Sequence, residues 1–138
     1  MKVNTQRILL GGLLAGLVIN VGETILNVVV IGAQFQRAVS AAGVAESSQS
    51  VLIFSLSGFV FGIVAVWIYA SIRPRFGAGP KTALYAGLAV WILYSGGFAA
   101  FHLAVPFVPA SVALATLGWG LVEVPLATML GAAVYKEV

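Results

Sequence analysis

The chain contains no cysteine and no aspartate, and charged residues of any kind are scarce. Without cysteine there is no disulfide framework, no thiol nucleophile and no thiolate metal site. Charged residues make up 8% of the 138 residues, against about 25% in an ordinary soluble domain. A soluble fold with so few charges would not stay dissolved. The sequence therefore predicts a membrane protein in contact with lipid.

The scarcity of charge also excludes several functions. The pI is near 9.6, but the basic residues are spread over short segments between apolar runs and form no groove-sized patch for nucleic acid. No group of side chains has the spacing of a metal site, and no serine or histidine is arranged as a nucleophile. We expect no metal, no nucleic acid and no enzyme activity.

Long apolar runs are what the chain has instead. Apolar residues make up 61% of the sequence, and the mean hydropathy is +1.08. A helix needs about 20 mostly apolar residues to cross about 30 Å of hydrocarbon. Four segments satisfy this condition and predict an all-α membrane protein, a single four-helix bundle over residues 1–138. The predicted spans are 8–31, 51–72, 82–103 and 112–135.

Turn and cap residues separate these spans. Ser47, Ser48 and Ser50 precede the second span as candidate N-caps. Before the third span, the sequence predicts a tight turn with Pro80 in the first turn of the next helix. That turn is formed by Pro74, Gly77, Gly79 and Pro80.

The longest connection, residues 32–50, has two interpretations. Phe35, Ala38, Val39 and Ala42 fall at i, i+3, i+4 and i+7, which favours a short interfacial helix ending at Gly43. An irregular polar loop is the alternative.

The basic residues predict the orientation in the membrane. Six of the seven lie on one side: Lys2, Arg7, Arg73, Arg75, Lys81 and Lys136. Only Arg37 falls in the connection on the other side. Because lysine and arginine concentrate in cytoplasmic segments, we expect both termini in the cytoplasm. The expected location is the bacterial inner membrane.

The first span carries a polar face. Gly12, Gly16, Asn20, Glu23 and Asn27 recur at steps of three and four, which places them on one side of a helix. Small residues let another helix approach closely, and polar residues can form hydrogen bonds across the contact. This face therefore contacts protein, either as a packing seam or as part of a transport pathway.

The fourth span has a similar face with Thr116, Gly120 and Glu123. Pro125 lacks an N–H, so the carbonyl of Leu121 loses its helical donor and we expect a kink beside Glu123. A carboxylate at membrane depth costs about 2.5 kcal/mol or more, so such residues face protein or water.

Glu123 is predicted to lie level with Asn20, and Glu23 about one turn nearer the outer side of the membrane. Asn20 and Glu123 each lie about 18 Å from the same side of the membrane at 1.5 Å per residue. If the first and fourth spans are neighbours, Glu123 meets Asn20, and Thr116 lies level with Asn27. No lysine or arginine lies at that depth, so we expect at least one of Glu23 and Glu123 to be protonated at neutral pH.

The remaining candidate positions carry weaker signals. Gly58 and Gly62 in the second span form another pair of small residues for close helix packing. His102, the only histidine, falls near the end of the third span. No cofactor is expected. A second copy or another subunit could still complete a haem site, or His102 could ligate a chlorin, and an interfacial histidine bonded to water is the simpler interpretation.

Three stretches carry a family resemblance. They are 8–27, 66–82 (VWIYASIRPRFGAGPKT) and 119–135 (WGLVEVPLATMLGAAVY). In these stretches the chain resembles small bacterial four-span integral membrane proteins with no assigned function. The resemblance implies the four-span architecture and no activity. In architecture alone the chain also resembles small multidrug transporters, but the residues around Glu23 do not match their motif.

Three functions fit these observations. The first is a non-enzymatic accessory or structural subunit of a larger membrane complex. The second is a proton-coupled small-molecule transporter that works as a homo-oligomer and uses Glu23 and Glu123. The third is a haem- or pigment-binding module that uses His102.

Overall fold

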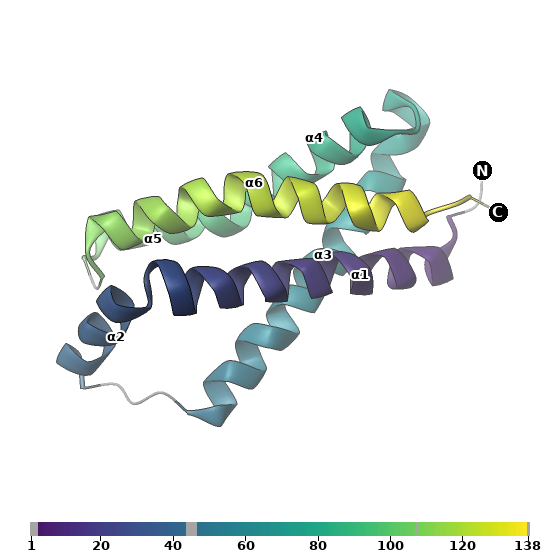
Figure 1. Ribbon diagram of the computed structural model, residues 1–138. Coiled ribbons are helices and arrows are strands. Elements are labelled where there is room, and N and C mark those ends of the chain that lie inside the picture. The colour runs from purple at the N-terminus through teal and green to yellow at the C-terminus, as the bar shows by residue number, and fades with distance from the viewer. Residues whose placement is uncertain (1–2, 44–46, 107, 138) are drawn as a thin grey trace.

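The computed structural model describes residues 3–43, 47–106 and 108–137, and these residues form helices joined by short turns. Four helical segments are long and apolar enough to cross a membrane, which confirms the predicted all-α fold with four such helices (Figure 1). The elements are α1 (Thr5–Ile25), the π-helical turn η1 (Leu26–Val30), α2 (Gly32–Ala41), α3 (Ser48–Phe76), α4 (Pro80–Trp91), the π-helical turn η2 (Ile92–Gly96), α5 (Gly97–Ala104) and α6 (Ala110–Val134).

Local sequence signals fix where several helices begin. The Ser47 side chain accepts a hydrogen bond from the backbone N–H of Ser50 at 3.1 Å and caps α3. Asn4 caps α1 in the same way through Arg7. Pro80 is the first residue of α4, where a missing N–H costs nothing. The predicted cap at Ser47 and the predicted role of Pro80 are both confirmed.

The predicted turn at Pro74 is wrong, because α3 continues through this residue to Phe76. A proline in the last turn of a helix removes one backbone donor without ending the helix. Gly77 ends it instead, with φ at 86° and its N–H bonded to the carbonyl of Arg73. Positive φ is nearly free for glycine, so the turn falls at Gly77–Gly79.

Two of the four spans contain a π-helical turn that the sequence did not reveal. The first span passes from α1 into η1, and the third consists of α4, η2 and α5. Between spans one and two lies α2, which ends just before Gly43, whose φ is 70°. The short helix predicted in the 32–50 connection is therefore confirmed.

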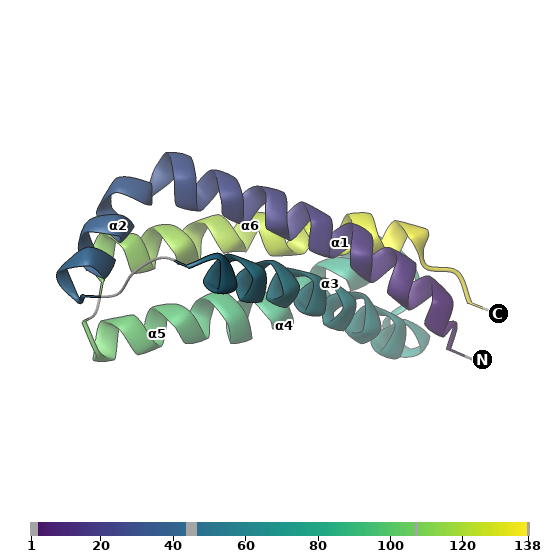
Figure 2. The same cartoon turned by 90° about the horizontal axis from the view of Figure 1, so that it is seen from below.

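Within the bundle, α1 packs against both α3 and α6, and α4 packs against α6 (Figures 1 and 2). The start of α1 and the end of α6 lie at the same end of the bundle (Figures 1 and 2). Glycines bring α1 and α3 together, because a Cβ added to Gly62 would overlap the backbone of Gly12 and Gly16. The first and fourth spans are thus neighbours, which brings Glu23 and Glu123 into one region.

The first half of α3, residues 48–60, contacts α1 at Ser55, Gly58 and Phe59 and exposes most of its other residues. Its apolar side chains are exposed, with Val51 at 64% and Phe54 at 71%. The second half is packed, with Ala65 and Val66 fully buried. The second half of this span therefore belongs to the protein core, and the first half presents an apolar surface outside its contacts with α1.

Candidate functional site

Glu123 is buried inside the bundle. Its residue is only 7% exposed, and α6 holds it against α1. The contact on α1 is Gly22, where an added Cβ would overlap the Glu123 carboxyl. A side chain at position 22 would therefore displace the acid, so this glycine creates the space that the carboxyl fills.

Both carboxyl oxygens of Glu123 lack a hydrogen-bond partner among the described residues. The same is true of Ser95 Oγ on η2. Trp119 Nε1, one turn before Glu123 on α6, also makes no well-formed hydrogen bond, but its side chain interacts with the Glu123 carboxyl. Nearly every buried polar group in a protein is hydrogen-bonded, and an unpaired one costs about 1–3 kcal/mol. Such a cost is retained where the group has another use, such as binding a proton or ligand.

Glu23 is held quite differently, because both of its carboxyl oxygens accept hydrogen bonds. The Tyr94 hydroxyl donates to Glu23 Oε1 at 3.2 Å. The Asn27 amide donates to Oε2 at 3.0 Å and to the backbone carbonyl of Glu23 at 2.8 Å. Two donors suit an ionised carboxylate, which only accepts hydrogen bonds.

Both donors to Glu23 lie in the π-helical turns. Asn27 belongs to η1 and Tyr94 to η2. A π-turn inserts an extra residue and re-aims the side chains that follow, and such turns are common at functional sites. From η2, Tyr94 reaches Glu23 on α1 while the neighbouring Ser95 packs against Gly120 on α6.

The rest of the third span is anchored close by. The Trp91 indole donates to the backbone carbonyl of Leu117 on α6 at 2.9 Å. The Tyr94 ring packs on Phe61 of α3, with ring centroids 4.4 Å apart. These contacts fix the aromatic side chains on either side of the acids, so the donor to Glu23 has little freedom to move.

We define the acid cluster as Glu23, Asn27, Tyr94 and Glu123. The two carboxyl groups and the tyrosine are close enough for their charges to interact. The one ion pair among the described residues, Arg73 with Glu137 at 3.6 Å, involves neither acid of the cluster. Neighbouring carboxyl groups without a counter-ion cannot both ionise cheaply.

The predicted contact between Asn20 and Glu123 is wrong. The Asn20 amide does not bond Glu123; it donates to the carbonyl of Ser55 on α3 at 3.1 Å and to the carbonyl of Gly16 at 2.8 Å. Thr116, which was predicted to lie level with Asn27, donates to the Val112 carbonyl in its own helix. The physical reason is that α3 crosses α1 beside Asn20, and short polar side chains readily bond the carbonyl four residues earlier.

The predicted packing residues lie at helix contacts. Gly12 and Gly16 face Ile63 and Phe59 of α3. On the α3 side Gly58 lies against Asn20, and Gly62 lies against Gly12 and Gly16. Gly120 lies against Ser95, and Pro125 lies inside an uninterrupted α6 with its backbone against Gly87 of α4. The seam predicted on the first span therefore contacts α3 at its beginning and the acid cluster at its end, where Asn27 itself is exposed.

His102 lies on α5. Its Nδ1 is 2.8 Å from the carbonyl of Phe98, and its ring packs on Phe98 with centroids 3.9 Å apart. Phe101 contacts the ring edge-on at 5.2 Å. The ring is thus held by its own helix.

Three residues of the site were not predicted from the sequence: Gly22, Tyr94 and Trp119. No sequence signal marks Gly22 among the sixteen glycines, and its contact with Glu123 on another helix is seen only in the folded chain. Tyr94 did carry a signal, because tyrosine prefers the membrane interface and this one lies within a span. A polar tip at that depth requires a partner, here Glu23.

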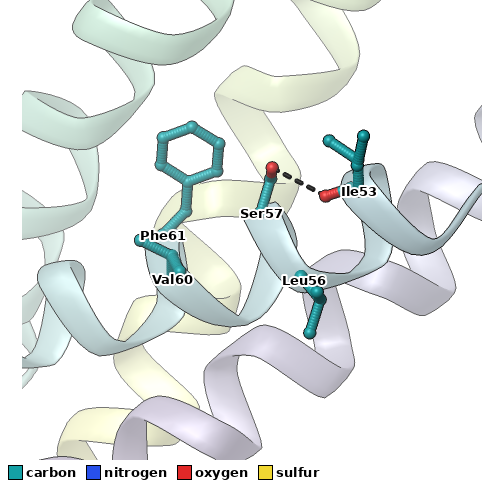
Figure 3. A pocket seen from close by; sticks show the side chains of 5 residues that line it. All are labelled: Ile53, Leu56, Ser57, Val60 and Phe61. Atoms are coloured by element: carbon teal, nitrogen blue, oxygen red, sulfur yellow. Dashed lines mark hydrogen bonds between the residues drawn. The ribbon is translucent and has the colours of Figure 1, made fainter. Parts of the chain in front are cut away.

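A shallow apolar groove lies on α3 near the cluster (Figure 3). It has a volume of about 270 Å³ and is lined by Ile53, Leu56, Ser57, Val60 and Phe61. The Ser57 hydroxyl is bonded to the Ile53 carbonyl at 2.8 Å, so it offers its proton to its own helix. Through Phe61 the groove borders Tyr94.

Chemically, the arrangement offers two carboxyl groups in one apolar region. Glu23 accepts hydrogen bonds on both oxygens, and Glu123 accepts no well-formed hydrogen bond from the described residues. Such a pair can bind positive charge, and a proton is the smallest occupant. No family model, curated protein or solved structure matches this chain. Membership of the small four-span family therefore stays a prediction from the resemblance.

Proposed function

We propose that this protein is a multi-pass membrane transporter that couples the movement of a small molecule to proton binding at the acid cluster. The observation that carries the proposal is Glu123, whose residue is 7% exposed and whose two oxygens have no partner among the described residues. Ionisable groups inside membrane spans are costly and are retained mainly for transport or coupling. A purely structural joint would be expected to satisfy its polar atoms.

Proton binding would change the charge of the site while adding almost no volume to it. A proton that adds to a Glu123 carboxylate forms an O–H bond and removes one negative charge close to Glu23. Loss of that repulsion favours closer packing of α1 and α6, which meet at Gly22. Protonation therefore biases helix packing, which is the kind of coupling that alternating access requires.

The proposal includes an oligomer. Glycine contacts press α1 onto α3, and Gly22 presses onto Glu123, which leaves little room for a solute inside one copy. The exposed half of α3 and its groove offer an apolar surface on which a second copy would complete a path. Membrane transporters commonly place their sites between such repeated units.

We further propose that the protein resides in the bacterial inner membrane with both termini in the cytoplasm. The distribution of basic residues supports this orientation, since six of seven lie on the side of the two chain ends and the Gly77–Gly79 turn. The bacterial location is supported by the resemblance to small four-span bacterial proteins.

Proton flux into vesicles tests the function. Purified protein is reconstituted into liposomes that contain a pH-sensitive dye, and a pH step or candidate solute gradient is applied. We expect flux that depends on the protein and is lost in Glu123→Gln and Glu23→Gln. Glu137→Gln is the matched control, because Glu137 pairs with Arg73 and lies outside the cluster. Flux that survives both cluster substitutions would reject the transporter.

The accessory-subunit function is the second candidate, and the exposed half of α3 favours it. This surface carries apolar side chains such as Phe54, Leu52 and Val60, each more than half exposed. In this candidate function a partner subunit covers the surface; lipid and a second copy of the chain are the alternatives. Purification in mild detergent followed by mass spectrometry distinguishes these cases. Co-migration with one large complex, together with intact activity of that complex in Glu123→Gln, would favour this candidate.

Haem or chlorin binding through His102 stays the third hypothesis. A ligating imidazole needs one ring nitrogen directed at the metal while the other is hydrogen-bonded, and Nδ1 already contacts the Phe98 carbonyl. The residues present are compatible with this arrangement but supply one histidine only. A purified protein without visible absorbance would reject the hypothesis.

A further inference from the structure

We propose that the acid cluster is a binding site for a single proton, which Glu123 holds while Glu23 stays ionised on Tyr94 and Asn27. The inference rests on the proposed function for what the proton does, but not for where the proton lies. It assigns a different role to each of two acids that the sequence does not distinguish.

The hydrogen bonds to Glu23 favour its ionised form. Glu23 accepts at Oε1 from Tyr94 and at Oε2 from Asn27, at 3.2 and 3.0 Å. A protonated carboxyl would turn one of those oxygens into a donor and waste an acceptor. Because an amide N–H₂ only donates, the Asn27 contact in particular favours the ionised form.

The surroundings of Glu123 favour its neutral form. Neither of its oxygens accepts a well-formed hydrogen bond from the described residues, and the Trp119 indole is the one donor whose side chain interacts with the carboxyl. That single weak contact compensates little of the hydration that an ionised carboxylate would lose. Its residue is 7% exposed and is enclosed by Gly22 of α1 and by its own helix. A neutral carboxylic acid is the form with the smaller desolvation cost.

The charges around Glu123 also favour a single proton on the pair of acids. The titratable groups that face Glu123 are Glu23 from α1 and Tyr94 from η2. The titratable side chains of α3 and α4 lie toward the opposite ends of those helices: Tyr69, Arg73, Arg75, Lys81 and Tyr85. On α5, His102 lies two helical turns beyond Tyr94. With a fixed anion at Glu23 and no cation beside it, a second anion at Glu123 would add repulsion, so the pair holds one proton.

The packing argues for a proton over a metal ion. Sodium or calcium needs several oxygen ligands around it. At Glu123 a single added methyl group on Gly22 would already overlap the carboxyl, and Ser95 Oγ is pressed onto Gly120. A proton needs no such space.

Infrared spectroscopy of the protein in lipid vesicles tests the assignment directly. At neutral pH we expect a protonated-carboxyl carbonyl band that disappears in Glu123→Gln and persists in Glu23→Gln and in the control Glu137→Gln. A band that disappears in Glu23→Gln and persists in Glu123→Gln would reverse the roles and overturn the proposal. Loss of the band when sodium replaces choline at constant pH and ionic strength would assign the site to a metal ion and also overturn it.

The role of Tyr94 has its own readout. In the Glu123→Gln background Glu23 should give no carbonyl band, and the added substitution Tyr94→Phe should create one, because the anion loses its donor. Tyr85→Phe is the matched control, since Tyr85 lies on α4 and packs on Phe76. If Tyr94→Phe leaves the spectrum of the Glu123→Gln protein unchanged, Tyr94 is not the positioning residue and that part of the proposal fails.

A measurement on the unaltered protein protects the test against misfolded variants. The chain has four glutamates and no aspartate, so ¹³C-glutamate labelling gives four side-chain carboxyl signals. We expect one of the four to have the chemical shift of a protonated acid at pH 7. None or two would overturn the single-proton site. One protonated signal without proton flux in vesicles would leave this inference standing while the proposed transport fails.

Discussion

The contact between α1 and α3 allows a quantitative test with a single methyl group. Gly62 lies where the two helices cross, and an added Cβ would overlap the backbone of Gly12 and Gly16, with the Gly16 Cα at 2.7 Å. Backbone atoms cannot rotate away as a side chain can, so the helices must separate. Overpacking of this kind costs about 1–3 kcal/mol.

A matched substitution isolates this cost from helix propensity. Alanine is better than glycine in a helix by about 1 kcal/mol, and this gain applies to Gly62→Ala and Gly118→Ala alike. At Gly118 on α6 an added Cβ meets nothing within 4 Å. The difference between the two variants therefore reports the overpacking alone, and we expect Gly62→Ala to be less stable by about 1–3 kcal/mol.

The stability of Gly22→Ala should fall between those of Gly62→Ala and Gly118→Ala. Its added Cβ would meet the carboxyl end of Glu123, which is the far end of a flexible side chain and can move. The free energy of unfolding is measured by detergent titration in mixed micelles and followed by tryptophan fluorescence, since the chain has three tryptophans. Equal stability of Gly62→Ala and Gly118→Ala would refute the close crossing of α1 and α3.

Three further predictions concern single contacts and topology. Asn20→Ala removes the bond to Ser55 O across α1 and α3 and should cost about 0.6 kcal/mol, and at most about 1.7; a larger loss in the same titration would mean that Asn20 has a second role. Trp91→Phe removes the bond to Leu117 O between the third span and α6, and should cost about 1 kcal/mol; an unchanged stability would show that the bond contributes nothing. Because the chain has no cysteine, Ala78→Cys gives one thiol in the Gly77–Gly79 turn, and an impermeant maleimide should label it only after cells are opened; labelling of intact cells would reverse the proposed orientation.

The sequence by itself determined the class of protein and the number of apolar helices. Charge scarcity and the long apolar runs are properties of composition, and they act on each helix separately, so no tertiary contact is needed to read them. Local signals also worked where the cause was local, as at the Ser47 cap, at Pro80 and in the helix after Gly32. Pro74 misled the prediction because a proline near a helix end weakens the helix without stopping it.

Only the tertiary structure decided which polar groups meet. Helical spacing alone allowed Asn20 to bond Glu123. In the folded chain α3 crosses α1 beside Asn20, and the Asn20 amide donates to the Ser55 carbonyl instead. The donors to Glu23 lie in two π-helical turns, which rotate the following side chains to another face of the helix. An apolar sequence carries no pattern that predicts such turns. The two glutamates are chemically identical in the sequence, and they differ in the folded chain because donors surround one and a glycine backbone faces the other.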